Sequence, residues 1–206
     1  MFTKLSPPNF CLLCKARCER HDLDLCNACL KDLPLCQDAK IVAPFLYAPP
    51  IDRMILALKF GQDLKYARLL GKLLTEKLLL KYQNLPKPEA IIPIPLHKKR
   101  LAERGYNQAL EIARYVGKEM QIRIDKNSCE RTKNTLAQSS LSHKDRKNNI
   151  SGAFVLRKKI SVRHIAILDD VTTTGNTVAE LSETLKSAGV ERIDVWCVCK
   201  TLLNKD

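Results

Sequence analysis

Short apolar runs alternate with longer amphipathic segments from residue 41 onward. In Asp63–Tyr82, apolar residues at positions 64, 67, 70, 74 and 78 recur at the spacing of a helix face, and Asp63 is a favourable N-cap. Similar patterns predict helices over Ile51–Phe60, Asn107–Met120 and Asn176–Ser187. The apolar runs predict strands over Ile41–Ala48, Ala90–Leu96, Ile122–Ile124, Ile165–Leu168 and Arg192–Cys199. This alternation predicts an α/β fold with a mostly parallel twisted sheet flanked by helices on both faces.

Residues 1–40 lack this periodicity, so we expect a small module over residues 1–40 and the α/β domain over residues 41–206. Met1–Phe10 has no apolar core of a signal peptide, and no later stretch approaches the roughly 20 apolar residues of a membrane span. We therefore expect a soluble, cytoplasmic protein. In that reducing compartment the nine cysteines are better suited to metal binding than to disulfides.

Four cysteines of the N-terminal module form two CxxC pairs, Cys11 with Cys14 and Cys26 with Cys29. Their spacing is typical of a tetrahedral thiolate zinc site, and four thiolates leave no open coordination position. We therefore predict a structural Zn2+ that supplies the folding free energy of the module. Spare donors that could replace a ligand or form a second site are Cys18, His21 and Cys36. The cysteines expected in the core are Cys129, Cys197 and Cys199.

The positive charge is concentrated in the middle of the chain. Of the formal net charge of +13, the segment Lys87–Lys159 carries +10, from 17 Lys and Arg against 7 Asp and Glu. Such a segment is either a solvated surface or the binding surface for a polyanion. Within it, Thr132–Asn149 is polar and without periodicity, and loops of that length are usually functional lids or disordered.

The apolar strand that begins at Ile165 ends in two adjacent acids, Asp169 and Asp170, followed by a turn rich in threonine. Backbone N–H groups of such a turn and of the following helix N-terminus can hold a phosphate, and the threonine hydroxyls add donors. Carboxylates accept hydrogen bonds from vicinal hydroxyls, so the acids suit the 2- and 3-hydroxyls of a ribose 5-phosphate. The plainer interpretation is a strand end with a solvated acid pair and a threonine N-cap.

The sequence AILDDVTTTGNT resembles the loop of type I phosphoribosyltransferases that binds 5-phosphoribosyl-1-pyrophosphate (PRPP). Together with the CxxC pairs, YAPPIDRMILALKF, IPIPLHKKRLAERGYNQA, RTKNTLAQSSLSHKDRKNNISGAF and VWCVCKTL, it is similar to the ComF family of competence-associated, phosphoribosyltransferase-like proteins over nearly the entire chain. Many members carry a further CxxC where this chain has only Cys36, which puts a second metal site in doubt.

The resemblance implies a PRPP site, with Asp169 and Asp170 as the catalytic, ribose-holding pair. The further residues that it places on PRPP are Thr172, Thr173, Thr174, Gly175, Asn176, Thr177, Lys99, Arg100 and Arg104. The three cations, with Gly105 and Asn107, form the expected pyrophosphate-facing loop, where Mg2+ would bridge the diphosphate oxygens. A flexible lid that also offers contacts to DNA is expected from Arg131, Gln138, Lys144, Arg146 and Lys147.

Two functions follow from these residues. The family resemblance implies a cytoplasmic role in natural transformation, with PRPP and incoming single-stranded DNA as ligands and other competence proteins as partners; Tyr106 is a candidate for stacking on a base. The alternative is a metabolic phosphoribosyltransferase that acts on an unidentified acceptor without binding DNA. No acceptor-binding motif is evident, so the sequence leaves open whether the PRPP site is catalytic.

Overall fold

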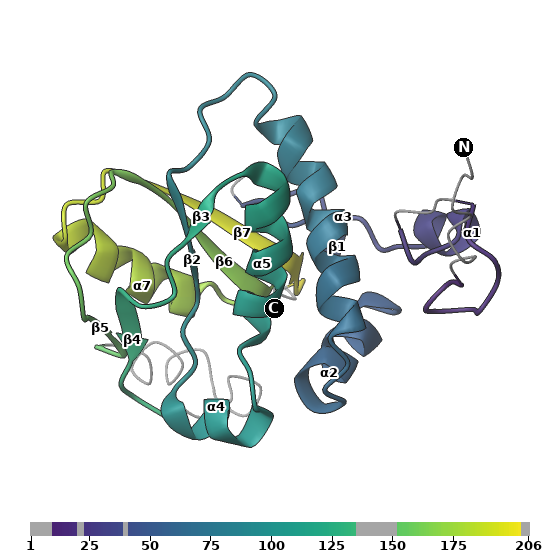
Figure 1. Cartoon of the computed structure of the whole chain (residues 1–206), viewed down its shortest axis with the longest axis horizontal. Coiled ribbons are helices and arrows are strands. Elements are labelled where there is room, and N and C mark those ends of the chain that lie inside the picture. The colour runs from purple at the N-terminus through teal and green to yellow at the C-terminus, as the bar shows by residue number, and fades with distance from the viewer. Residues whose placement is uncertain (1–9, 20–22, 39–40, 135–151, 203–206) are drawn as a thin grey trace, which may run out of the picture.

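The computed structural model describes residues 10–19, 23–38, 41–134 and 152–202 (Figure 1). A parallel sheet in the order β1-β7-β6-β2-β3 forms its centre. The strands are β1 (Phe45–Leu46), β2 (Ala90–Pro93), β3 (Arg123–Ile124), β6 (His164–Thr172) and β7 (Arg192–Lys200). The middle strand, β6, pairs with β7 on one side and with β2 on the other. Its apolar run Ile165–Leu168 is fully buried, as both faces of a covered parallel sheet require.

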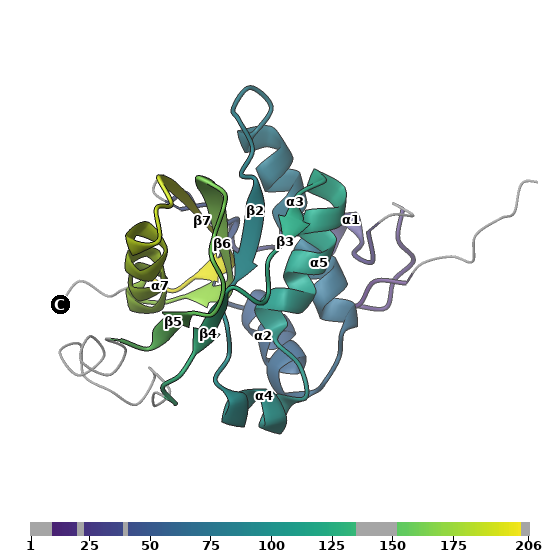
Figure 2. The same ribbon diagram turned by 60° about the vertical axis from the view of Figure 1, so that its left-hand side comes forward.

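Helices cover both faces of this sheet. Figure 2 shows α3 and α5 on one side of the strands and α7 on the other. The helices around the sheet are α2 (Ile51–Phe60), α3 (Lys65–Lys81), α5 (Gln108–Met120) and α7 (Asn176–Ser187). Alternate residues of β6 supply the two cores: Ala166 and Leu168 pack in the cluster of α2, α3 and α5, whereas Ile165 and Ile167 pack with α7. The predicted fold class is confirmed.

The order of the strands creates a crevice at one edge of the sheet. The chain moves outward from β2 through α5 to β3, but in the opposite direction from β6 through α7 to β7. The connections that leave the carboxyl ends of β2 and β6 therefore diverge. In open parallel sheets, ligands bind at such a switch point.

Helix α4, the β4–β5 pair and strand β6 are among the elements that differ from the sequence-based expectation. The segment after β2, predicted as a loop, begins with the short helix α4 (Lys98–Arg104), which ends at Gly105 in the left-handed region, with φ of 79°. An antiparallel pair that was not predicted joins β4 (Cys129–Arg131) to β5 (Phe154–Leu156). Strand β6 continues to Thr172, because its pairing with β7 extends that far.

The N-terminal module packs against α3 on the side away from the sheet (Figure 1). It contains the short helix α1 (Asn27–Lys31). Leu23, Leu25 and Leu33 are buried and belong to the same apolar cluster as α2, α3 and α5. The backbone N–H of Leu46 in β1 donates to the Pro34 carbonyl over 2.7 Å, which ties the module to the edge of the sheet. No helix in the described ranges is long and apolar enough to cross a membrane.

Candidate functional site

The two acids lie at the carboxyl end of β6, next to the crevice. Asp169 and Asp170 are consecutive residues of this strand, and their carboxyl groups interact with each other. Asp170 is buried, and its Oδ2 lies 2.8 Å from the Lys59 ammonium, which comes from the last turn of α2. The Asp169 Oδ1 accepts a hydrogen bond from the Asp170 backbone N–H over 2.9 Å. Lys59 was not among the predicted site residues, although it stands in the motif YAPPIDRMILALKF.

The surroundings shift the pKa values of the two carboxyl groups in opposite directions. Burial, and then the neighbouring Asp170 charge, raises the pKa of Asp169 well above its ordinary value. Burial alone would also raise the pKa of Asp170, but the Lys59 ammonium outweighs it and holds that pKa below the ordinary value. For the same reason the pKa of Lys59 is raised, because its attraction to Asp170 exceeds the cost of burial. The pair thus combines an ionised acceptor at Asp170 with a readily protonated one at Asp169.

The turn after β6 presents donors beside the acids. Gly175, with φ of 79°, occupies the N-cap of α7, and no side chain caps the helix. Gly175 itself offers no side-chain acceptor to the first N–H groups of α7, and these groups, together with the helix dipole, favour an anion. Within the described ranges, Thr174 Oγ1 is buried without a hydrogen-bond partner, and Thr172 is also buried. Thr172 is the last residue of β6, and Asn176 and Thr177 are the first residues of α7, so only Thr173, Thr174 and Gly175 of the predicted turn lie between the two elements.

A basic cleft of about 450 Å3 lies between the end of α2 and α4. Its lining residues are Lys59, Phe60, Gln62, Arg100, Glu103 and Arg104. Arg104 donates to Gln108 Oε1 over 2.9 Å. Burial and then the Arg104 charge lower the pKa of Arg100, so the guanidinium groups raise the free energy of each other's charged form. An anion in this cleft would relieve that repulsion.

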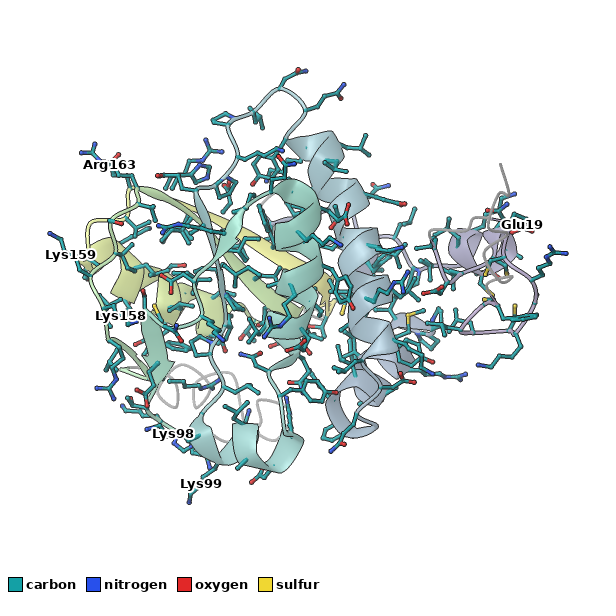
Figure 3. All side chains as sticks on the ribbon, viewed as in Figure 1. Glu19, Lys98, Lys99, Lys158, Lys159 and Arg163 are labelled. Carbon is teal, nitrogen blue, oxygen red and sulfur yellow. The ribbon has the colours of Figure 1, made fainter. Side chains whose placement is uncertain are left out.

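Of the three predicted diphosphate-binding cations, two line this cleft. Arg100 and Arg104 do so together with Lys59, whereas Lys99 is exposed and points outward from α4 (Figure 3). The expectation that these residues lie on a loop was wrong. His97 caps α4 by accepting from the Lys99 N–H, and the seven-residue helix sets Arg100 and Arg104 one turn apart on the same face.

The described part of the predicted lid also differs from expectation. Arg131 is not on a loop but in β4, where its side chain is buried and its guanidinium lies 5.7 Å from the centre of the Phe154 ring. The reason is its register opposite Phe154 in the β4–β5 pair. The other four residues of the predicted lid, Gln138, Lys144, Arg146 and Lys147, lie outside the described ranges.

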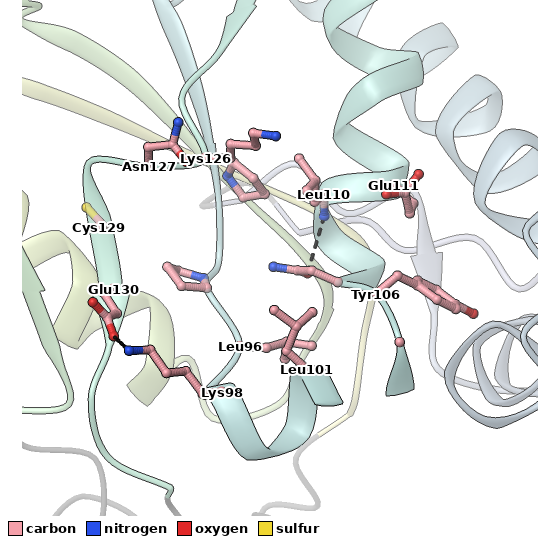
Figure 4. Close-up of a pocket in the computed structure, with 14 residues that line it drawn as sticks. Leu96, Lys98, Leu101, Tyr106, Leu110, Glu111, Lys126, Asn127, Cys129 and Glu130 are labelled. Atoms are coloured by element: carbon pink, nitrogen blue, oxygen red, sulfur yellow. Dashed lines mark hydrogen bonds and ion pairs between the residues drawn. The ribbon is translucent and has the colours of Figure 1, made fainter. Parts of the chain in front are cut away.

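A second cavity, of about 470 Å3, lies on the other side of α4 (Figure 4). Apolar side chains line much of it, among them Pro93, Leu96, Leu101 and Leu110. At its rim Lys98 pairs with Glu130 over 3.2 Å. Asn107 fixes the start of α5 here, since its amide donates to the Ile94 carbonyl over 2.9 Å and its Oδ1 accepts from the Leu110 N–H.

The four predicted metal-binding cysteines come together in the N-terminal module. The sulfur atoms of Cys11, Cys14, Cys26 and Cys29 all lie within 4.8 Å of one another. Cys14 Sγ is 3.6 Å from Cys26 Sγ, close to the roughly 3.8 Å between sulfurs that tetrahedral Zn–S bonds of about 2.3 Å require. The donor set and its geometry therefore fit one Zn2+.

The other predicted donors do not join this cluster. Cys18 is buried in the apolar core, Cys36 is half-buried, and His21 lies outside the described ranges. Three further cysteines are buried, as predicted: Cys129, Cys197 and Cys199.

Comparison with known proteins gives relatives over most of the chain. The DNA utilization protein YhgH of Escherichia coli K12 is 36% identical over 179 residues, which are 86% of this chain and 78% of the relative. Competence protein F of Haemophilus influenzae is 36% identical, covering 83% of this chain and 76% of its own length. Competence protein ComFC of Streptococcus pneumoniae is 25% identical, and the match covers 92% of this chain and 87% of the relative. The similarity is therefore not confined to one motif.

No family model matches the chain. Among solved structures, a hypoxanthine-guanine phosphoribosyltransferase of Bacillus anthracis aligns with 65% of this chain and 70% of its own, at 12% identity and a TM-score of 0.41.

The first prediction concerns the cost of the acid pair. We expect Asp169→Asn to increase the free energy of unfolding at pH 7 by about 1 kcal/mol, because it removes a group that is hard to ionise in the folded state. An acid whose folded pKa is raised destabilises the fold as pH rises above its unfolded pKa. The gain should therefore shrink near pH 4, where Asp169 is largely protonated in the folded state. Urea unfolding at pH 7 and near pH 4, monitored by the fluorescence of Trp196, the sole tryptophan, measures the free-energy gain at both pH values.

Asp170→Asn is the matched control, and we expect it to change the free energy of unfolding in the opposite direction. It should reduce the free energy of unfolding at pH 7 by about 2 kcal/mol, because it leaves the Lys59 ammonium without its partner; the loss is below that of a fully buried pair because Lys59 is 22% exposed. A decrease for both variants would contradict the proposed difference between the two acids.

The second prediction concerns the metal. Purified protein should contain about one zinc per chain, and Cys26→Ser should lose it, because a tetrahedral structural site needs all four ligands. Cys36→Ser is the control and should retain the zinc. Chelation should unfold the N-terminal module while the emission of Trp196, buried in β7, stays native. Metal-free protein with unchanged stability would refute the zinc site.

Proposed function

Since the chain belongs to the ComF family, we propose that it acts in DNA uptake during natural transformation, as a protein that binds PRPP and handles the incoming single strand. Two of its relatives are named competence proteins and one a DNA utilization protein. In this proposal, residues 1–40 are a zinc-binding module and residues 41–206 a phosphoribosyltransferase-like domain. The protein acts in the cytoplasm, where the strand arrives and where other competence proteins are its partners.

The observation that carries the proposed PRPP site is the meeting of three groups at the switch point of the sheet. The acids that end β6 accept hydrogen bonds from ribose hydroxyls. The turn from Thr173 to Gly175 and the uncapped N-terminus of α7 donate to the 5-phosphate. Arg100 and Arg104, in the basic cleft, neutralise the diphosphate. Hydroxyl, monophosphate and diphosphate recognition in one crevice matches the three chemical parts of PRPP.

Lys59 gives this proposed site a further property. Its ion pair holds Asp170 ionised, and an ionised carboxylate accepts stronger hydrogen bonds than a neutral one. The same ammonium lines the basic cleft, so it lies between the ribose acceptors and the place proposed for the diphosphate. Mg2+, when bound with PRPP, would neutralise part of the diphosphate charge beside Arg100 and Arg104.

The proposed interaction with DNA rests on charge and on the relatives. The segment Lys87–Lys159 carries most of the net positive charge, and it includes α4 and both arginines of the basic cleft. A phosphate backbone binds such a surface through release of its counterions. The incoming DNA strand and PRPP would therefore contact the same cations of the basic cleft.

A second candidate function is phosphoribosyl transfer to an acceptor, without a role for DNA. The cavity on the other side of α4 favours it, because about 470 Å3 lined by apolar side chains and a polar rim suits a small organic molecule. Release of pyrophosphate from PRPP, measured with and without single-stranded DNA, distinguishes the two. Release that requires DNA supports the first function, and release that DNA does not affect supports the second.

The third prediction concerns PRPP. The double variant Asp169→Asn, Asp170→Asn should weaken PRPP binding by several kcal/mol, because it removes the carboxyl acceptors for the ribose hydroxyls, and each charge-assisted bond to the ionised Asp170 is worth about 1.5–3 kcal/mol. Calorimetry in the presence of Mg2+ measures this, and native emission from Trp196, buried in β7, controls for folding of the sheet. Wild-type affinity in the double variant would exclude the ribose role.

The fourth prediction concerns the salt dependence of DNA binding. Affinity for single-stranded DNA should fall linearly with salt on logarithmic axes, at a slope of about −0.7 per neutralised phosphate. Replacing Lys144, Arg146 and Lys147 by Ala should reduce the magnitude of that slope by up to about 2. An unchanged slope would remove these residues from the DNA surface.

The matched control removes the same charge from α3, through Lys72→Ala, Lys77→Ala and Lys81→Ala, and should leave the slope nearly unchanged. PRPP with Mg2+ should alter DNA affinity, and DNA should alter PRPP affinity by the same factor, because linkage is reciprocal.

A further inference from the structure

Phe60 is an exposed aromatic residue inside the basic cleft. It is the last residue of α2, its side chain is 71% exposed, and it lines the cleft of about 450 Å3 beside Lys59. Exposed leucines also occur on this surface, but Phe60 is set apart by its aromatic face and its place among the cations of the cleft. Among the described residues the exposed phenylalanines are Phe10 and Phe60, and Phe10 lies next to the zinc-binding cysteines, away from this cleft.

The position of Phe60 is fixed by its neighbours. The N–H of Gly61 donates to the Ala57 carbonyl over 2.8 Å, which ends α2 directly after Phe60. A Cβ at Gly61 would stand 2.8 Å from that carbonyl oxygen, so the chain turns there in a space that only glycine fits. The Tyr106 hydroxyl donates to the Leu58 carbonyl and holds the same turn of α2 against the start of α5. The ring is thus presented on a rigid helix end.

Cations surround the ring. The Arg104 guanidinium lies over it, 5.6 Å from the ring centre, and is itself held by Gln108. Arg100 lines the same cleft one turn earlier in α4. Proteins that bind single strands combine these two features, an aromatic face for a base and cations that follow the phosphates.

The sequence had suggested Tyr106 for this role. Its hydroxyl is occupied by the α2 backbone and its side chain is only half-exposed, so Tyr106 positions α2 instead. The exposed aromatic ring in the basic cleft is therefore that of Phe60 and not that of Tyr106.

We propose that Phe60, with Arg104 and Arg100, is a stacking platform for a base of single-stranded DNA, next to the acids of the PRPP site. This rests on the proposed function. The ring stacks on the base, and the two guanidinium groups contact the phosphates on either side of it. Lys59 precedes Phe60 in the last turn of α2, lines the same cleft and pairs with Asp170, so the platform borders the proposed ribose-binding pair through Lys59.

The test uses two oligonucleotides and three variants. The probes are oligothymidylate of about 12 nucleotides and an abasic strand of the same length, which keeps the phosphates and lacks the bases. The variants are Phe60→Leu, which keeps apolar bulk without an aromatic face, Phe60→Trp, and Leu80→Ala as the control. Leu80 is 72% exposed on α3, which matches the exposure of Phe60.

Wild-type protein should bind oligothymidylate more tightly than the abasic strand. Phe60→Leu should lose roughly 5- to 150-fold in affinity for oligothymidylate, and its preference over the abasic strand should fall toward one. Its salt slope should stay unchanged, because stacking releases no counterions. In Phe60→Trp, oligothymidylate should quench the new fluorescence and thymidine monophosphate should not, which separates a strand from a free nucleotide. Leu80→Ala should behave as wild type.

Each contrary result has a distinct meaning. If Phe60→Leu keeps the full preference for oligothymidylate, the platform is refuted, and PRPP binding by the same variant shows that the proposed PRPP site stands. If thymidine monophosphate quenches Phe60→Trp as strongly as the oligonucleotide, the ligand is a nucleotide and the assignment to a strand is wrong. If the wild type binds no strand even at low salt, the proposed DNA function fails together with the platform.

Discussion

The ion pair between Lys59 and Asp170 makes the arrangement at the end of β6 possible. Two carboxylates on adjacent strand residues repel each other, and burial adds to the cost of ionising both. The Lys59 ammonium offsets this cost for Asp170 only, and it reaches that position because α2 ends beside the carboxyl end of the sheet. The same contact fixes the end of α2, from which Phe60 enters the basic cleft. Charge balance at the acids and the shape of the cleft are therefore consequences of one interaction.

The regular elements around the sheet could be predicted from local patterns. Helices α2 and α7 have the predicted bounds, and α5 begins at Gln108, one residue after the predicted start, because Asn107 is its N-cap. Periodicity and capping residues are properties of the segment itself. The four clustered cysteines could also be predicted, because the spacing of the two CxxC pairs is typical of a tetrahedral metal site. Asp169 and Asp170 were found from their position after an apolar run.

The features that could not be predicted from the sequence depend on contacts between distant segments. Lys59 is one of many lysines, and only the packing of α2 against β6 sets it beside Asp170, 111 residues later in the sequence. Arg131 was assigned to a loop because its neighbourhood is polar, but pairing with β5 more than twenty residues away makes it part of a strand. Helix α4 was missed because seven residues are too few to show periodicity; His97 and Gly105 delimit it. Tyr106 was read as an exposed base-stacking residue, and only the contact with Leu58 shows its structural use.

Helix α4 separates the two cavities and contributes residues to both. Lys98 and Leu101 face the apolar cavity, whereas Arg100 and Arg104 face the basic cleft. A helix of seven residues has little stability of its own, so its position depends on what it contacts at either side. Contacts that a ligand makes with Arg100 and Arg104 would stabilise the helix and thereby also fix Leu101 in the wall of the neighbouring cavity. A ligand contact with Arg100 or Arg104 and a ligand contact with Leu101 would therefore act on the same short helix.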